Sequence, residues 1–249
     1  HEVVLVVSQP DKAVGRSKAL KYTPVKECAV AHGIEVYQPA KIRAEESVEY
    51  LRQYNADIII VEAFGQIIPK TILDMPKYGC LNIHASLLPK YRGAAPIQQA
   101  VIDGEKESGV TIMQMGVGLD TGDMISQAVV PLAEDETGGS LFDKLAEEGA
   151  ALLIRTLPSI ADGTAVYTKQ PEESPTPYAA MISKKMGLMD FSKSAVELER
   201  LVRGLNPWPS AYTFLNGKTL KVWKCAVECA ECGKEAPGTI IGVDKSGIH

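Results

Sequence analysis

Short apolar runs recur through the first half of the chain with room for a helix between them, and this repetition constrains the fold more than any other feature. The runs at 3–7, 34–37, 57–63 and 80–84 have the length and composition of strands. The run at 57–63 is almost continuously apolar, so we expect a strand that is buried on both faces. Strands that alternate with helices predict an α/β fold, with a parallel sheet covered by helices.

The stretches between these runs carry helix signals. Thr23 is suited to cap a helix that begins at Pro24 and stops at Gly33. A second, polar helix is predicted over 45–54.

The middle of the chain changes pattern. Two β-like runs, 109–115 and 124–130, flank a glycine-containing turn at 118–122, which suits an antiparallel hairpin. Thr137 can then cap a helix whose apolar residues recur at helical spacing, namely Leu141, Leu145, Leu152 and Leu153.

A shift in composition between Gly163 and Pro177 indicates a semi-extended, proline-containing linker. We therefore expect a catalytic domain over 1–162, a linker over 163–182 and a small β-rich domain over 183–249. In this last part, 194–205 is predicted to be a short amphipathic helix. The strands 211–215 and 218–227 are predicted to form a hairpin through Asn216 and Gly217.

The composition of the chain bears on membrane insertion, nucleic-acid binding, cellular compartment and metal binding. No apolar run approaches the length of about 20 residues that spans a bilayer, so we expect no membrane insertion. The net charge of −5 argues against extensive nucleic-acid binding, although it leaves room for a local basic surface. Five cysteines, an odd and small number, suit a reducing compartment, and we expect a cytoplasmic protein. The spacing of Cys225, Cys229 and Cys232 resembles that of an iron–sulfur site, but without a supporting motif we expect no metal.

Asn82 and His84 are the first candidates for chemistry. They lie two residues apart at the end of the predicted strand 80–84, so their side chains point to the same face of the sheet. In an open parallel sheet, ligands bind beyond the carboxyl ends of the strands. An isolated pair of this kind is more often a loop cap beside a structural histidine than a catalytic pair.

The sequence around this pair resembles the folate-dependent formyltransferase family. The resemblance rests on LNIHASLLPKYRGAAPI at 81–97, GVTIM at 109–113 and LDTGD at 119–123, in an unbroken order. It extends to QPDKAVGRSKAL near the start and NPWP near the end. It implies a Rossmann-like catalytic domain followed by an OB-like domain. Because the family begins with a further strand and turn, we expect both domains to be incomplete at the chain ends, and the isolated chain to be unstable.

The resemblance implies that Asn82, His84 and Asp120 are catalytic. An amine attacks the formyl carbon and generates a tetrahedral oxyanion, to which Asn82 can donate an N–H. His84 can stabilise the same charge and transfer a proton, while Asp120 holds the imidazole and raises its pKa. No covalent intermediate is required.

The resemblance also implies two substrates. The donor is 10-formyltetrahydrofolate, and the acceptor is the amino group of methionyl initiator tRNA. We expect folate to contact Phe64 and Gly65 in one loop, and the Ser86–Pro89 segment, which comprises Ser86, Leu87, Leu88 and Pro89. Lys12, Arg16 and Lys18 are expected to bind tRNA as part of a basic segment that also contains Lys21 and Lys26. We expect a monomer.

Three alternatives stay open at this point. One is a formyltransferase that acts on a nucleotide-linked amino sugar, and another is a hydrolase that releases formate from formyl-folate. The third is a tRNA- or folate-binding module without catalysis. For the basic segment, a solvated surface without a ligand is the competing interpretation.

Overall fold

The computed structural model describes residues 1–14, 19–228 and 235–249. The chain forms two compact units, each built from segments that are separate in sequence. The first unit comprises 1–84, 111–126 and 152–172, and the second comprises 85–110, 127–151 and 173–249. The domain and linker boundaries expected from the sequence stay predictions.

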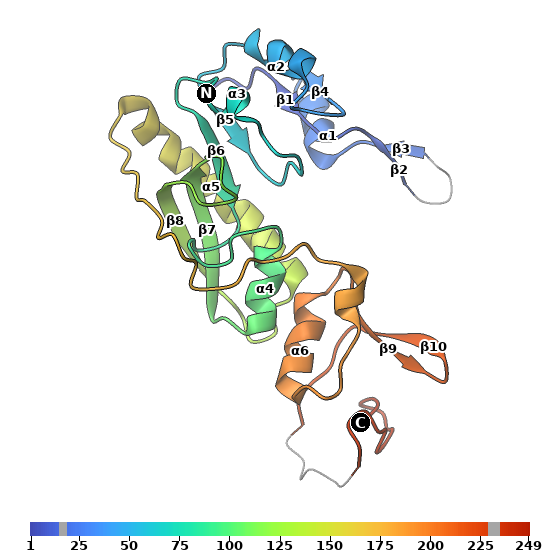
Figure 1. The fold of residues 1–249 in the computed structure, drawn as a ribbon. Helices are drawn as coiled ribbons and strands as arrows, with labels where there is room; N and C mark the ends of the chain where they lie inside the picture. The colour runs from blue at the N-terminus through green and yellow to red at the C-terminus, as the bar shows by residue number, and fades with distance from the viewer. Residues whose placement is uncertain (15–18, 229–234) are drawn as a thin grey trace. The chain divides into compact units, whose positions relative to one another are not determined.

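The first unit begins with the expected alternation of strand and helix (Figure 1). Strand β1 (Val6–Val7) pairs in parallel with β4 (Val36–Tyr37). The chain between them forms first the short hairpin of β2 (Lys12–Val14) and β3 (Ala19–Lys21) and then helix α1 (Pro24–Ala31). The N-cap of α1 is Thr23, whose hydroxyl accepts a hydrogen bond from the Lys26 backbone N–H. Gly33 follows the helix with a left-handed φ of 69°, which confirms the predicted stop.

A four-stranded sheet carries the centre of the fold, in the order β5-β6-β7-β8. The strands are β5 (Ile59–Val61), β6 (Cys80–His84), β7 (Glu107–Gln114) and β8 (Met124–Pro131). Strands β5 and β6 are parallel, whereas β6 and β7 are antiparallel. Helices α2 (Glu45–Arg52) and α3 (Lys70–Leu73) precede and follow β5 along the chain. Ile42, Val48, Ile72, Leu73 and Cys80 form a buried core here.

The prediction that the run 57–63 is buried on both faces is wrong. Strand β5 is only three residues long, and Ile60 at its centre is 37% exposed. The physical reason is its position at the end of the strand order, because an end strand has a neighbour on one side only. Strand β6, in contrast, is a core strand as expected, and Cys80 and Leu81 are fully buried.

Helix α5 (Gly138–Asp162) follows β8. The Thr137 hydroxyl accepts a hydrogen bond from the Ser140 backbone N–H at 3.0 Å, as its predicted capping role requires. Leu141, Leu145 and Leu152 are buried, as the helical spacing of the apolar positions predicts, whereas the fourth predicted position, Leu153, is half-buried. The helix continues beyond these residues to Asp162.

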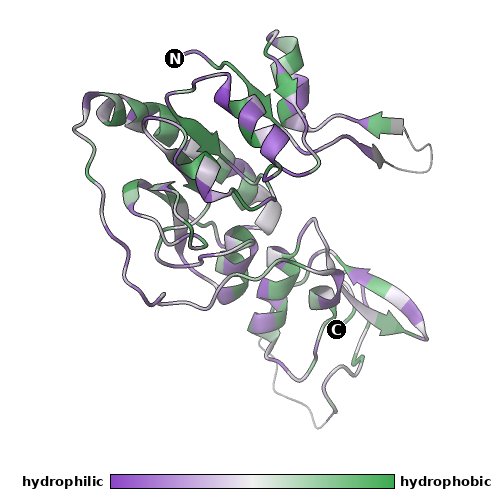
Figure 2. Cartoon of the chain, turned by 45° about the horizontal axis from the view of Figure 1, so that its top comes forward, coloured by the Kyte–Doolittle hydropathy of each residue, from purple (hydrophilic) through white to green (hydrophobic). Residues whose placement is uncertain are grey.

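The second unit contains α4 (Pro96–Asp103), the 3₁₀ helix η1 (Lys184–Gly187), α6 (Ala195–Gly204), β9 (Ala211–Leu215) and β10 (Lys218–Val222). Helix α6 has a capping box, in which Ser194 and Glu197 bond to each other's backbone N–H groups. Both hydrophilic and hydrophobic residues are visible on it in Figure 2, and Leu198 and Val202 are buried. Strands β9 and β10 form the predicted antiparallel hairpin, although β10 is shorter than expected.

Candidate functional site

The ends of β6 and the turn after β7 bring Asn82, His84 and Asp120 together. The Asn82 amide nitrogen Nδ2 donates a hydrogen bond to Asp120 Oδ1 at 3.4 Å. His84 Nδ1 lies 3.9 Å from Asp120 Oδ2. The carboxylate therefore contacts both side chains, one through each oxygen. The amide and the imidazole come from a single strand, as the two-residue spacing predicts.

Strand pairing fixes the backbone positions of Asn82 and His84. Asn82 lies opposite Val61 of β5 and Met113 of β7, and His84 lies opposite Thr111. His84 is 5% exposed. A strand held on both sides has little freedom to shift, so the Asn82 amide and the His84 imidazole are held in a fixed relation.

Asp120 depends on a turn instead of a strand. Its φ is 51°, in the left-handed region that a residue with a side chain seldom adopts. The Gln114 N–H donates to Asp123 O at 2.8 Å and closes the base of this turn. Gly122 is required, because an added Cβ would collide with the Gln114 carbonyl oxygen. The backbone of the turn is therefore constrained before any substrate is considered.

Gln170 contacts this turn, although no pattern in the sequence marks it as a site residue. Its side-chain Nε2 donates to Asp120 O at 3.0 Å and to Gly122 O at 2.7 Å. Gln170 lies in the segment 163–182, which the sequence marks only as a linker. No local signal points to it, because its partners lie about fifty residues earlier in the chain.

The first predicted folate-contact loop belongs to the first unit. Gly65 has a φ of 75°, and the Phe64 carbonyl oxygen accepts a hydrogen bond from Gln9 Nε2 at 2.6 Å. The Phe64 side chain packs partly buried against the core around Ile72. The loop is thus anchored at Phe64, while the Gly65 backbone needs the conformational freedom of glycine.

The second predicted folate-contact segment, Ser86–Pro89, belongs to the second unit. Ser86 is fully buried, and its hydroxyl donates to Lys90 O at 2.7 Å. Leu88 is also buried. Leu87 and Pro89 differ from these two, because they line a pocket of about 300 Å³.

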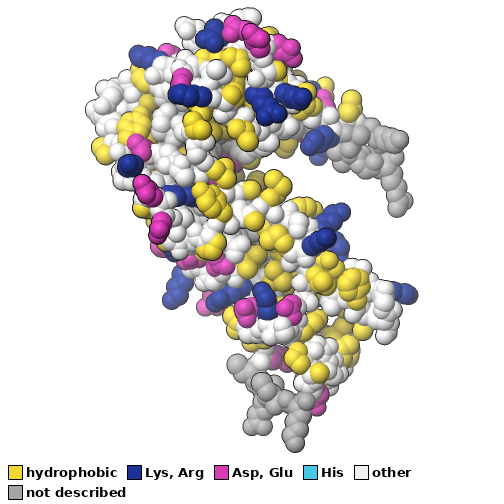
Figure 3. All heavy atoms as spheres, in the orientation of Figure 1, with side chains coloured by type: hydrophobic (Ala, Val, Ile, Leu, Met, Phe, Trp, Pro, Cys, Tyr) yellow, Lys and Arg dark blue, Asp and Glu magenta, His cyan; other side chains and the backbone are white. Residues whose placement is uncertain are grey.

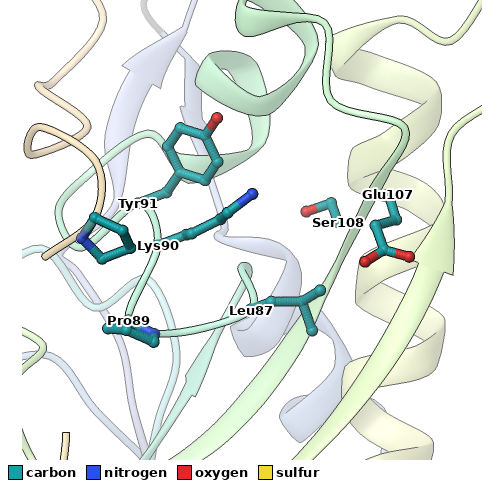
Figure 4. Close-up of a pocket in the computed structure, with 7 residues that line it drawn as sticks. Leu87, Pro89, Lys90, Tyr91, Glu107 and Ser108 are labelled. Carbon is teal, nitrogen blue, oxygen red and sulfur yellow. The ribbon is translucent and has the colours of Figure 1, made fainter. Parts of the chain in front are cut away.

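Figure 4 shows this pocket, whose other lining residues are Lys90, Tyr91, Glu107, Ser108 and Pro175. Lys90 Nζ donates to Glu105 at 2.9 Å, and this bond is the main cause of the lowered pKa of the Glu105 carboxyl. Burial raises the pKa of Tyr91, with a further contribution from hydrogen bonds to Glu105 and Asp103. Ser108 is 4% exposed, and its hydroxyl has no hydrogen-bond partner among the residues that the structure describes.

The predicted tRNA-binding residues are placed only in part. Lys12 is exposed on β2, whereas Arg16 and Lys18 lie outside the described residues. Lys26 does not belong to a free basic surface: it lies on α1 and bonds to Asp11 and Gln38, each at 2.6 Å. Asp11 has a lowered pKa, chiefly because of the hydrogen bond from Lys26. On the face drawn in Figure 3, Lys and Arg side chains are interspersed with Asp and Glu side chains.

The described residues contain no group of three or more His, Cys, Asp or Glu side chains that could hold a metal ion. Cys229 and Cys232, two of the three cysteines with iron–sulfur-like spacing, lie outside the described residues. No helix in the described parts of the chain is long and apolar enough to cross a membrane.

An α/β fold in which an amide and an imidazole from one core strand lie beside a carboxylate from a neighbouring turn fits a group-transfer enzyme. The family model described as formyl transferase matches residues 1–157, and the model for its C-terminal domain matches residues 181–249. The chain belongs to the formyltransferase family.

Relatives and a solved structure give the finer comparison. The chain is 62% identical to the methionyl-tRNA formyltransferase of Agathobacter rectalis, over 100% of this chain and 80% of that protein. It is 56% identical to the protein of the same name from Lachnospira eligens, over 99% of this chain and 79% of that protein. The N-formyltransferase from Helicobacter canadensis, solved with folinic acid and dTDP-3-aminofucose, has a TM-score of 0.65 at 23% identity. This likeness covers 87% of this chain and 74% of that one, and it shows the shared fold alone.

Proposed function

We propose that this protein transfers the formyl group of 10-formyltetrahydrofolate to the α-amino group of methionyl initiator tRNA, in the cytoplasm, for the start of translation. The observation that carries the reaction is the contact of Asp120 with both Asn82 and His84. The acceptor is inferred from the names of relatives that are 62% and 56% identical over almost the whole chain.

In this mechanism, the methionyl nitrogen attacks the formyl carbon and the carbonyl oxygen becomes an oxyanion. A side-chain amide carries two N–H donors. Asn82 uses one of them on Asp120 in this structure, so the second N–H is the one proposed to stabilise the oxyanion. Asp120 then acts as the orienting group for the oxyanion donor as well as for the imidazole.

His84 is proposed to carry the proton. The attacking nitrogen gains a bond to carbon and loses one proton, while the bond between the formyl carbon and the folate N10 breaks and N10 gains one proton. His84 is held 3.9 Å from Asp120 and can pass a proton between the two nitrogens directly or through a water. A free α-amino group, with a pKa of about 8, needs little further activation.

For the donor, we propose that the Phe64–Gly65 loop and the Ser86–Pro89 segment contact the folate. Gly65 supports this proposal, because a glycine has no side chain that would lie between the loop and a flat ligand. Its left-handed φ of 75° is also one that glycine adopts readily. Leu87 and Pro89 support it in the second unit, because they are the members of that segment that line the pocket.

The acceptor assay tests the proposed function directly. Purified protein is incubated with 10-formyltetrahydrofolate and, in separate reactions, methionyl-tRNA, an amino-sugar nucleotide or water alone. We expect formyl-methionyl-tRNA to form fastest by a wide margin. Preferential formylation of the sugar nucleotide would favour the second family activity, and release of formate in water at an equal rate would favour a hydrolase.

A pair of glycine variants tests the folate loop. Gly65 and Gly33 both have a left-handed φ, of 75° and 69°, and an added Cβ would meet no atom closer than 3.8 Å at either position. Alanine therefore imposes a similar backbone cost at both sites. We expect Gly65→Ala to weaken binding of a folate analogue in a fluorescence titration and Gly33→Ala to leave it unchanged. Equal affinities would place the folate elsewhere.

A further inference from the structure

The segment that follows α5 returns to the turn that carries Asp120. Met124 and Thr168 exchange both backbone hydrogen bonds, at 2.9 and 2.8 Å, between the turn and the segment. Gln170 lies two residues beyond Thr168 and is 5% exposed. This pair of backbone hydrogen bonds between Met124 and Thr168 therefore fixes the backbone from which the buried Gln170 side chain extends to the turn.

The side-chain amide of Gln170 holds the turn at two places. Nε2 donates to the carbonyl oxygen of Asp120 at 3.0 Å and to that of Gly122 at 2.7 Å. A primary amide nitrogen has two N–H groups, so these two carbonyls use its donor capacity. A hydrocarbon side chain of the same length could make neither bond.

Apolar packing contributes little on the side of the turn that carries Asp120. Met115, at the start of the turn, packs against the core around Ile72. In contrast, Val117 and Leu119, which lie nearer to Asp120 in the chain, are 83% and 63% exposed and contribute little buried area. Asp120 itself has a left-handed φ of 51°, which is unfavourable for a residue with a side chain and persists only where the surrounding contacts offset its cost. Polar bonds to the backbone, rather than apolar packing, must therefore hold Asp120 in place.

We propose that Gln170 is a positioning residue for the formyl-transfer reaction. Its amide fixes the backbone of Asp120, and so places the carboxylate where it contacts Asn82 Nδ2 at 3.4 Å and lies 3.9 Å from His84 Nδ1. This inference rests on the proposed function, because it assigns a consequence to the position of Asp120. Gln170 acts through Asp120 and does not itself touch the reacting atoms.

The test removes the two donors and keeps the volume. In Gln170→Met, we expect kcat for formylation of methionyl-tRNA to fall by about ten- to a hundredfold, because a small displacement of a catalytic group has an effect of that order. The KM values for tRNA and for folate should stay close to those of the wild type. A merely structural loss would lower the active fraction or the Tm without acting through one group.

A double-mutant cycle separates these cases. If Gln170 acts through Asp120, then Gln170→Met should cause no further loss of kcat in an Asp120→Asn background. A loss of equal size in both backgrounds would overturn the proposal, and so would wild-type kcat in Gln170→Met. If Asp120→Asn alone were as active as the wild type, the proposed role of Asp120 would fail instead, and the two failures are thus distinguishable.

Thr156→Val serves as the matched control. Thr156 is also a buried polar residue of the first unit; its hydroxyl donates to Leu152 O at 2.7 Å and lies 2.6 Å from the Ser126 hydroxyl of β8, and neither partner belongs to the turn. We expect it to lower Tm while kcat stays at the wild-type value. If Gln170→Met does not fold, Gln170→Asn replaces it, because its shorter amide cannot reach both carbonyls. A wild-type kcat in that variant would equally overturn the proposal.

Discussion

The carboxylate of Asp120 lies between the Asn82 amide, from which it accepts a hydrogen bond at 3.4 Å, and the His84 imidazole at 3.9 Å. One acidic side chain thus orients two groups of different chemistry. The Asn82 amide nitrogen donates one N–H to Asp120, and its second N–H is the donor that we propose for the oxyanion. This division of the two donors leads to the first prediction.

Asn82→Ala should lower kcat for methionyl-tRNA by about a hundredfold or more, since removal of one oxyanion donor costs about 2.7–4 kcal/mol. The KM for folate should change little, because the interaction forms with the transition state. Steady-state kinetics measure both values, and Gln53→Ala, which removes an exposed amide, is the control. Near-normal turnover of Asn82→Ala would rule out the oxyanion role.

Arg16→Ala should raise the KM for tRNA and leave the binding of formyl-folate unchanged. A guanidinium pairs with phosphate through two hydrogen bonds, and tRNA affinity should therefore also fall as salt is added. The control is Arg52→Ala, which removes an exposed arginine that is paired with Glu49. If Arg16→Ala weakens folate and tRNA binding equally, the segment has a structural role, and full activity would indicate a solvated surface.

Glu136 provides a prediction for the pH dependence of stability. Its side chain is buried and accepts hydrogen bonds from Lys144 Nζ and Ser140 Oγ, both at 2.5 Å. Burial acts to raise the pKa of Glu136, but the hydrogen bonds from Lys144, Ser140 and the Ala133 backbone N–H, together with the charge of Lys144, outweigh burial, and the pKa is lowered. Glu136→Gln should therefore lower the free energy of unfolding at pH 7 by about 1.5–3 kcal/mol, as for a hydrogen bond to a charged group.

The sign of the pH effect follows from the lowered pKa. The contribution of Glu136 is fully present above the pKa of an unfolded glutamate, about 4.3, and is lost as the pH falls through the folded pKa. The difference in the free energy of unfolding between the wild type and Glu136→Gln, measured by urea unfolding, should therefore shrink below that pH. Glu147→Gln, which changes an exposed residue on α5, the helix that carries Lys144, should show no such difference. A difference in unfolding free energy between the wild type and Glu136→Gln that stays constant down to acidic pH would contradict this role of the Glu136 carboxylate.

Cys80 and Cys28 should differ sharply in reactivity towards a thiol reagent. Burial raises the pKa of Cys80 to about 12, and the nearby charge of Asp74 contributes. The reactive thiolate is therefore scarce at pH 8, whereas Cys28 is exposed. Peptide mapping after brief alkylation should find Cys28 modified and Cys80 protected until denaturant is added. Equal labelling in native buffer would show that β6 opens readily.

Local patterns in the sequence predicted several features of the fold and one feature of the site. Thr23 and Thr137 cap helices because a hydroxyl before a helical run satisfies free N–H groups at the helix start. Asn216 and Gly217 form the hairpin turn because both tolerate a left-handed backbone. Asn82 and His84 share a face because side chains alternate along a strand. Each of these features depends on residues that are close together in the chain.

The tertiary structure decided what no local pattern contains. Asp120 reaches Asn82 across 38 residues, and Gln170 reaches Asp120 across 50. Lys26 lies in a basic stretch of sequence, yet folding pairs it with Asp11. The apolar sequence around Ile60 predicts a core residue, yet its strand lies at the end of the sheet and Ile60 is exposed. Sequence periodicity reports how backbone and side chains repeat along an element, whereas these outcomes depend on which distant segments pack together, and that is settled only when the chain folds.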